Sequence, residues 1–273
     1  MRQVEERYIS LLTDFGFKRI FGTAINKDLL ICFLNSLFDG KQVVKDVSYL
    51  NPEHVGDVYT DRKAIFDVYC EGENGEKFIV EMQNAYQTYF KDRSLFYSTF
   101  PIREQAALLN FDMNEEAFEK EKIRHSVQLC DTATHKVFYD KLELIYVEIA
   151  KFNKSLEELE TLYDKWLYAL KNLYKLTQRP KELCDKVFDR LFEEAEIAKF
   201  TPQELREYEA SKIAYRDIKN SVDTAKREGI AEGMEKRSLE IARKLLAKGI
   251  DEATVKEITG LSAEHILQLK AEI

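Results

Sequence analysis

Two apolar stretches separated by an Asn-Gly pair carry acidic side chains that could bind a metal ion. Apolar side chains alternate along residues 64–70 and 77–83, as in strands that each bury one face. The Asn-Gly pair between them predicts a β-hairpin. Asp67 lies on the first predicted strand, and Glu81 and Gln83 lie on the second.

The hydrophobic pattern also predicts which side chains share a face of this hairpin. Because side chains alternate along a strand, packing the apolar residues together places Asp67, Glu81 and Gln83 on the opposite face. A two-residue turn would instead pair Asp67 with Met82. We therefore expect a loop with an odd number of residues, or a bulge with Gly75 in the left-handed conformation. Four side chains should be buried on the apolar face: Phe66, Val68, Val80 and Met82.

Two carboxylates on neighbouring strands can hold a hard cation, because their Cβ atoms lie roughly 4.5–8 Å apart. Mg²⁺ takes few protein carboxylates and keeps water and phosphate ligands. Such an ion polarises a phosphodiester and lowers the pKa of an attacking water. Without the ion the two acids repel, so at least one should have a raised pKa. The alternative is a half-exposed sheet face with two solvated acids.

The hairpin resembles the core of the PD-(D/E)XK nucleases, in the variant where Gln replaces the usual Lys. Four further segments resemble the Rpn family of recombination-promoting nucleases and transposases: residues 14–22, 33–37, 93–97 and 147–152. The ordered series covers most of residues 8–230. It implies an α/β fold with a restriction-endonuclease-like core, a mixed sheet flanked by helices, followed by a mainly helical C-terminal extension.

The same resemblance implies metal-dependent cleavage of DNA. Asp67 and Glu81 would ligate Mg²⁺, with Mn²⁺ as an alternative ion, and Gln83 would occupy the position of the catalytic Lys. The missing cation would then come from elsewhere, and Lys63 and Lys18 are candidates, although either could be a solvated or capping lysine.

Two residues near these segments have competing interpretations. Arg93 could clamp a DNA phosphate through its planar donors or pair with an acid such as Asp92. Asp14 is better suited to cap the helix that begins at Phe15 than to serve as a third metal ligand.

One departure from the family pattern falls near residues 105–107, where a loop and part of a strand are shortened. We expect a strand at 107–111 that keeps the sheet continuous, with Ala107, Leu109 and Phe111 facing the core. The alternative is an irregular segment in a protein that has lost its activity.

The chain divides into an α/β nuclease-like core at 1–153, a helical extension at 154–248 and a helix-turn-helix-like module at 249–273. Asp251 and Ser262 should cap the two helices of this module. Its second helix is poor in side chains that read base edges, which favours packing or homo-oligomer assembly over base reading.

Composition limits the partners of the protein. The 273 residues carry 41 basic and 49 acidic side chains, a net charge of −8, so contact with DNA requires local patches. The apolar runs are too short for a membrane span, and the four scattered cysteines suggest neither disulfides nor zinc. These features indicate a cytoplasmic protein.

We therefore expect a Mg²⁺-dependent DNA endonuclease of the transposase or recombination-promoting type. A catalytically silent DNA-binding or assembly protein is the alternative, and cleavage of RNA is a third reading, because the metal chemistry does not distinguish the sugars.

Overall fold

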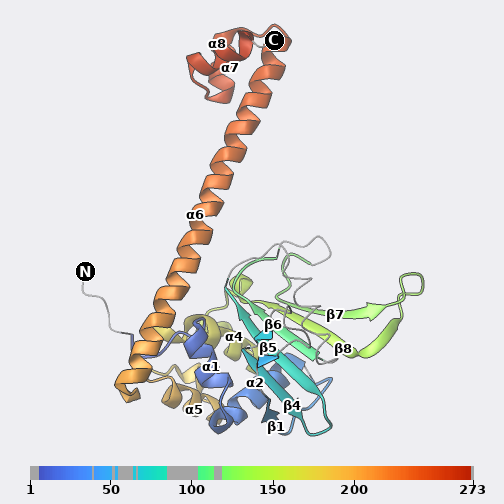
Figure 1. The fold of residues 1–273 in the computed structure, drawn as a ribbon, viewed down its shortest axis with the longest axis vertical. Helices are drawn as coiled ribbons and strands as arrows, with labels where there is room; N and C mark the ends of the chain where they lie inside the picture. The colour runs from blue at the N-terminus through green and yellow to red at the C-terminus, as the bar shows by residue number, and fades with distance from the viewer. Residues whose placement is uncertain are drawn as a thin grey trace. The chain divides into compact units, whose positions relative to one another are not determined.

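A mixed six-stranded sheet forms the centre of the N-terminal part of the protein (Figure 1). The computed structural model describes residues 6–38, 40–50, 53–54, 64–65, 67–84, 104–113 and 119–271. The strand order is β1-β4-β5-β6-β8-β7, with β5, β6 and β8 parallel to one another and the other pairs antiparallel. The bounds are β1 (Val47–Tyr49), β4 (Val68–Gly72), β5 (Lys77–Gln83), β6 (Glu104–Leu109), β7 (Arg124–Cys130) and β8 (Val137–Glu148). A separate antiparallel pair joins β2 (Glu53–His54) and β3 (Ala64–Ile65).

Helices from both ends of the N-terminal part pack against one face of the sheet. They are α1 (Asp14–Phe21), α2 (Lys27–Phe38), α4 (Leu162–Asn172), α5 (Lys186–Glu194) and the start of α6 (Pro202–Ala247). Short 3₁₀ turns lie at Ala24–Asn26, Ile149–Lys151, Leu156–Glu158, Leu173–Lys175, Lys181–Leu183 and Ile197–Lys199. At the centre of the core, the ring of Trp166 lies 5.7 Å from that of Phe21, 5.6 Å from that of Phe33 and 5.0 Å from that of Phe188.

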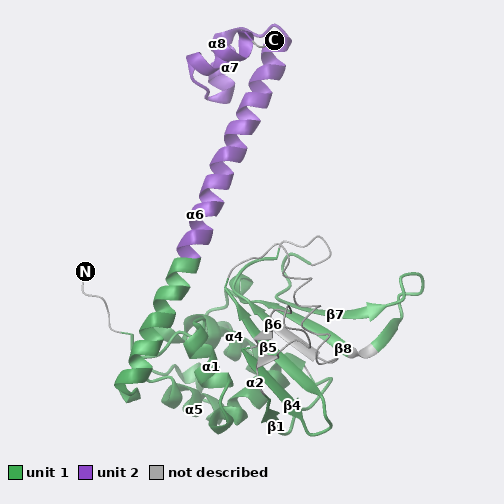
Figure 2. Cartoon of the chain, viewed as in Figure 1, with its two compact units in different colours: residues 1–218 green, residues 219–273 purple. Residues whose placement is uncertain are grey.

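The contacts divide the chain into two compact units, residues 1–218 and 219–273 (Figure 2). Helices that follow residue 153 share a core with those that precede it, so no boundary between compact units lies there. The domain boundaries expected at 153 and 248 stay predictions.

Helix α1 begins differently from the expectation that Asp14 caps it. Thr13 is the N-cap, and its side-chain oxygen accepts from the Gly16 N–H at 3.1 Å and donates to the Ser10 carbonyl at 2.8 Å. Asp14 is the first helical residue, where its negative charge interacts favourably with the helix dipole. Thr13 outcompetes it because the hydroxyl can both accept and donate.

Gly16 is required by the tight turn that precedes α1. A Cβ there would overlap the Ser10 carbonyl oxygen and lie 2.9 Å from Thr13 Oγ1. We expect Gly16→Ala to lower the free energy of unfolding by about 1–3 kcal/mol, measured by urea unfolding with Trp166 fluorescence. Gly229→Ala is the control, because a Cβ at that helical glycine has open space and should not destabilise. Equal effects of the two substitutions would contradict the account of the turn.

The strand expected at residues 107–111 forms, but at Glu104–Leu109. It pairs with β5 and β8, so the sheet is continuous across the shortened segment. The predicted facing of its side chains is wrong: Leu108 joins the main core, whereas Leu109 and Phe111 contribute to a smaller cluster that also contains Met113. Apolar cover on both faces removes the alternation on which the prediction relied.

The C-terminal unit contains α7 (Glu252–Thr259) and α8 (Ala263–Ala271), which form one apolar cluster with the end of α6. Asp251 accepts from the Thr254 N–H at 3.0 Å, and Ser262 accepts from the His265 N–H at 3.2 Å. Gly260 ends α7 in the left-handed conformation, with φ of 68°. The two predicted caps are confirmed.

Among the described residues, no single helix combines the length and apolar character that a membrane span requires. The bent pair formed by α1 and residues Ala24–Phe38 meets the criteria only when its two parts are joined across a 64° break. Side chains from both parts, among them Phe17 and Leu30, are fully buried in the protein core.

Candidate active site

The hairpin of β4 and β5 has the register that the hydrophobic pattern predicts. Val68 pairs with Val80 and Cys70 with Phe78, and all four side chains are buried in the main core. The connecting loop has three residues, 73–75, closed by the bond from the Gly72 N–H to the Glu76 carbonyl at 2.8 Å. Gly75 is left-handed, with φ of 80°. The odd loop and the left-handed glycine are therefore confirmed.

This register brings the predicted polar residues together on the other face of the hairpin. Val68 pairs with Val80, so continuing the same register by one residue places Asp67 directly opposite Glu81. Gln83 lies two residues further along β5, and its Nε2 donates to Glu81 Oε2 at 3.2 Å. The Asp67 Oδ2 accepts from the Met82 N–H at 2.8 Å, which fixes the carboxylate against β5. Glu81 is 4% exposed, so this acid is buried in the fold.

The ammonium group of Lys18, on α1, lies close to Asp67. Lys18 Nζ lies 3.7 Å from Asp67 Oδ1 and 2.7 Å from Asp14 Oδ1. Of the two lysines proposed from the sequence, Lys18 therefore lies beside the acids. Lys63 lies outside the described residues, as do Phe66 and Arg93.

Burial raises the pKa of Asp67 above its ordinary value. The Met82 N–H and the Lys18 ammonium oppose the rise, and the nearby Asp14 carboxylate adds to it. The predicted upward direction is confirmed, but desolvation is the main cause. The pKa of Lys18 is also raised: burial lowers it, and the hydrogen bonds and charges of Asp14 and Asp67 outweigh that effect.

Because its pKa is raised, the ionised Asp67 side chain lowers the stability of the metal-free protein. Between its ordinary and raised pKa the folded protein binds more protons than the unfolded chain, so this group's contribution to stability falls as pH rises. Asp67→Asn keeps an oxygen for the Met82 N–H and removes the charge. We expect it to raise the melting temperature in EDTA at neutral pH, with a gain that shrinks as pH falls through the raised pKa.

Asp46→Asn is the matched control for this measurement. The hydrogen bond from Lys27, followed by that from the Val47 N–H, lowers the pKa of the half-exposed Asp46. Removal of this charge should therefore not raise the melting temperature. A loss of stability in Asp67→Asn would contradict the account of Asp67.

The carboxyl edge of the parallel strands carries an amide network that we did not predict. Asn84 Nδ2 donates to the Leu12 carbonyl at 3.0 Å, which ties the approach to α1 to the end of β5. Asn110 Nδ2 lies 3.1 Å from the Tyr215 hydroxyl on α6 and 3.5 Å from Asn84 Oδ1. A polar residue directly after each apolar strand was the available sequence signal.

A second buried acid, Glu148, ends β8 on the same face as Gln83. The two residues share a row through Leu109, two strands apart, or about 10 Å. Glu148 is fully buried; its Oε1 accepts from the Met113 N–H at 2.5 Å, and its Oε2 lies 2.7 Å from Lys151 Nζ. Glu148 lies in segment 147–152, which carries part of the family resemblance, but the sequence itself indicates no role for this acid.

His125 completes the surroundings of Glu148. Its Nε2 lies 3.1 Å from Glu148 Oε2 and 3.0 Å from the Lys122 carbonyl oxygen. Because both neighbours are acceptors, Nε2 carries the proton. Both carboxylate oxygens of Glu148 thus make contacts that join the strand ends. This structural role distinguishes Glu148 from Asp67 and Glu81.

The donor set at the hairpin suits a magnesium ion. The described residues contain no group of three or more His, Cys, Asp or Glu side chains arranged to hold a metal. Mg²⁺ commonly binds to one or two protein carboxylates, and water and phosphate oxygens complete its shell. Asp67 and Glu81 supply two. The ammonium of Lys18 against Asp67 shows that this position already attracts positive charge.

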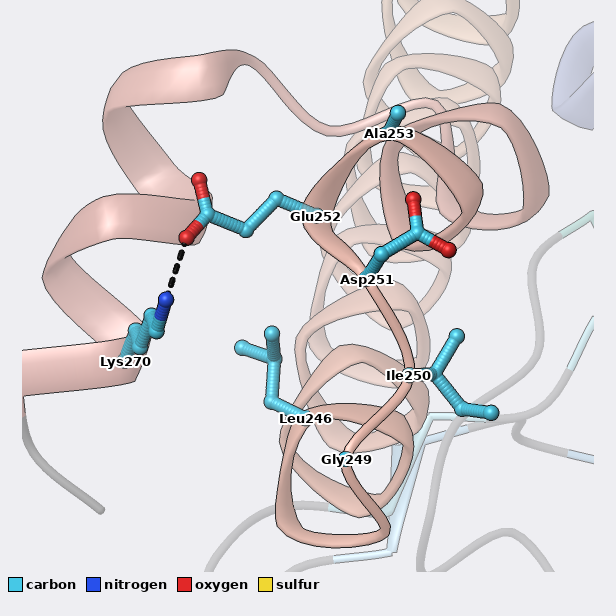
Figure 3. Close-up of a pocket in the computed structure, with 7 residues that line it drawn as sticks. All are labelled: Leu246, Gly249, Ile250, Asp251, Glu252, Ala253 and Lys270. Atoms are coloured by element: carbon cyan, nitrogen blue, oxygen red, sulfur yellow. Dashed lines mark hydrogen bonds and ion pairs between the residues drawn. The ribbon is translucent and has the colours of Figure 1, made fainter.

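A pocket of about 580 Å³ lies in the C-terminal unit (Figure 3). It is lined by Leu246, Gly249, Ile250, Asp251, Glu252, Ala253 and Lys270. Its charged groups are already engaged, because Lys270 Nζ pairs with Glu252 at 2.6 Å and Asp251 caps α7. These contacts stabilise the module and offer no reactive group.

Comparison with known families identifies both parts of the chain. The family of PD-(D/E)XK nuclease family transposases matches residues 11–225, and the C-terminal HTH domain of the Rpn/YhgA-like nuclease family matches residues 235–271. A search of curated proteins and a search of solved structures each returned no match. The predicted restriction-endonuclease-like core is confirmed by the first match together with the mixed sheet and its helices. By a match that covers most of its length, the chain belongs to the PD-(D/E)XK nuclease family transposases.

Proposed function

We propose that this protein is a Mg²⁺-dependent endonuclease that hydrolyses DNA phosphodiester bonds during transposition or recombination. The observation that carries the proposal is the position of Asp67 opposite Glu81, with Gln83 beside them, on a hairpin within a nuclease-family domain. The nuclease chemistry is assigned to residues 1–153, and the remaining helices and the module at 249–273 support DNA engagement and assembly.

Asp67 and Glu81 would hold the ion, with Mn²⁺ able to replace Mg²⁺. When bound, the ion supplies Lewis-acid activation of the phosphate and a lowered pKa for the attacking water. The bond from the Met82 N–H holds the Asp67 carboxylate in place before the ion arrives. Gln83 orients Glu81 through its amide, and burial of Glu81 excludes competing water from that carboxylate.

DNA is the proposed substrate because the C-terminal unit matches an HTH domain found with this nuclease family. A helix-turn-helix places its second helix, here α8, against the major groove. The exposed side chains of α8 include Glu264, His265, Gln268 and Lys270, and the helix contains neither arginine nor asparagine, so few of its side chains can read base edges. We therefore expect binding with weak sequence preference that falls as salt rises.

Calorimetric titration with Mn²⁺ in the absence of DNA tests the metal site directly. Wild-type protein should give a binding isotherm, and Glu81→Ala should lose it while remaining folded. Glu119→Ala is the control, because Glu119 is exposed and pairs only loosely with Lys122, at 3.4 Å. Unchanged Mn²⁺ binding by folded Glu81→Ala would remove Glu81 from the ligand set and favour the catalytically silent alternative.

A further inference from the structure

The proposed site has no cation on the strand position where PD-(D/E)XK nucleases carry their lysine. Gln83 is neutral, and its amide is directed at Glu81 Oε2, 3.2 Å away. Hydrolysis of a phosphodiester builds negative charge on the phosphate oxygens, and a fixed positive donor aimed at that charge lowers the barrier. A second source of positive charge would therefore serve this site.

Lys18 is the described lysine that contacts a proposed metal ligand. Its Nζ lies 3.7 Å from Asp67 Oδ1, beyond the reach of a strong hydrogen bond, and 2.7 Å from Asp14 Oδ1. The Lys18 side chain is 40% exposed and that of Asp14 is 65% exposed. Because solvent screens exposed pairs, the bond to Asp14 orients the ammonium without holding it strongly.

Lys151, near the other end of the same sheet edge, is arranged differently. Its Nζ is bound by Glu148 at 2.7 Å and by Asp112 at 3.3 Å, and its side chain is 16% exposed. The short-range partner of Lys151 is the fully buried Glu148, whereas that of Lys18 is the exposed Asp14. Lys18 keeps donor capacity that a phosphate or a water can use.

The backbone that carries Lys18 is fixed on several sides. Thr13 caps α1, and the Asn84 amide ties Leu12 to the end of β5. The Phe15 N–H donates to Ser211 Oγ at 3.0 Å, and Phe17 is fully buried. Residues 12–17, directly before Lys18, are therefore anchored to the sheet, the core and α6, so that the ammonium is presented to the hairpin from a rigid support.

We propose that Lys18 supplies the ammonium group that position 83 lacks, as a catalytic residue of the proposed nuclease. This inference rests on the proposed function. In the reaction the water oxygen bonds to phosphorus, the bond from phosphorus to the leaving sugar oxygen breaks, the water releases a proton to solvent and the leaving oxygen takes one up. Lys18 stays protonated throughout and donates to a non-bridging phosphate oxygen or to the attacking water.

A pair of substitutions tests this role through rescue. Lys18→Met should slow single-turnover plasmid cleavage in Mg²⁺ by on the order of 10²-fold to 10³-fold, the effect of removing one donor to developing charge. Gln83→Lys in the same chain restores a lysine on the strand, so the double variant should recover at least about tenfold of the lost rate. A lysine needed only for folding would not be replaced from position 83.

Metal binding and a matched lysine supply the controls. Lys18→Met should bind Mn²⁺ within about threefold of the wild-type affinity in calorimetry, because both carboxylates remain. Lys27→Met removes a comparable surface pair with Asp46, 2.7 Å long, and should cleave at the wild-type rate.

The possible outcomes separate this inference from the proposed function. Wild-type cleavage with an unimpaired Lys18→Met, or a double variant as slow as Lys18→Met, would overturn the role of Lys18 and leave the nuclease intact. Lost Mn²⁺ binding in Lys18→Met would also overturn it, because Lys18 would then act through the metal ligands. Absence of cleavage by wild-type protein would overturn both.

Discussion

Glu81→Gln should slow Mg²⁺-dependent DNA cleavage by on the order of 10³-fold, because loss of metal activation costs several kcal/mol at the transition state. The change keeps the size of the side chain and the acceptor for the Gln83 amide, but it removes the charge that the ion requires. Glu81 is buried, so solvent cannot supply a replacement ligand easily. Single-turnover cleavage with saturating protein measures the effect on the chemical step.

Glu71→Gln is the matched control on the same hairpin. Glu71 lies on β4 and pairs with Lys77 across the ladder at 3.3 Å, away from the carboxyl edge of β5. Its replacement should leave the rate within about twofold, because surface pairs contribute little. If Glu81→Gln retained wild-type cleavage while remaining folded, the metal site would have to be sought elsewhere.

Glu148→Ala should lower the free energy of unfolding by about 3–5 kcal/mol, the cost of breaking a buried ion pair on one side. The substitution removes the acceptors for the Met113 N–H and His125 and the counter-ion of Lys151. A loss of this size is a large share of the stability of a typical domain. Urea unfolding can be followed by the fluorescence of Trp166, the single tryptophan, which is buried in the main core and reports on unfolding of the unit that also contains Glu148.

Two further variants show whether the effect comes from the buried network. Glu119→Ala, at an exposed pair, should change the unfolding free energy by less than about 0.5 kcal/mol. Glu148→Gln keeps two polar atoms and should cost less than Glu148→Ala. Equal stability of Glu148→Ala and wild type would mean that this network does not hold the strand ends together.

Local patterns predicted the hairpin well. Alternation of apolar residues set the faces of β4 and β5, and the mismatch with a two-residue turn predicted the odd loop with left-handed Gly75. These features depend on neighbours within about fifteen residues, where side-chain period and turn chemistry determine the geometry. The helix caps at Asp251 and Ser262 were predictable for the same reason.

Features that depend on distant parts of the chain were harder to predict. Whether Lys18 approaches Asp67 depends on how α1 docks, which Asn84 and Ser211 help to set from far along the sequence. The prediction of which face of the sheet Leu108 occupies was wrong. Apolar side chains cover both faces of the sheet, so the sequence lacks the alternation that marks a half-exposed strand.

The amide network and the Glu148 cluster were missed for a related reason. Asn110 meets Tyr215, and Glu148 meets His125 and Met113, only after the strands have paired. Single polar residues at strand ends carry no spacing signal that separates such contacts from solvated side chains. Thr13 displaced Asp14 as the cap because the preceding turn brings the Ser10 carbonyl to its hydroxyl.

Incubation of supercoiled plasmid with purified protein, in Mg²⁺ or in EDTA, tests the central claim most directly. We expect wild-type protein to produce nicked and linear DNA in Mg²⁺ and none in EDTA, and Asp67→Ala prepared in parallel to produce neither. Intact plasmid with wild-type protein in Mg²⁺, or equal cleavage by Asp67→Ala, would contradict the assignment of this hairpin as the active site of a metal-dependent nuclease.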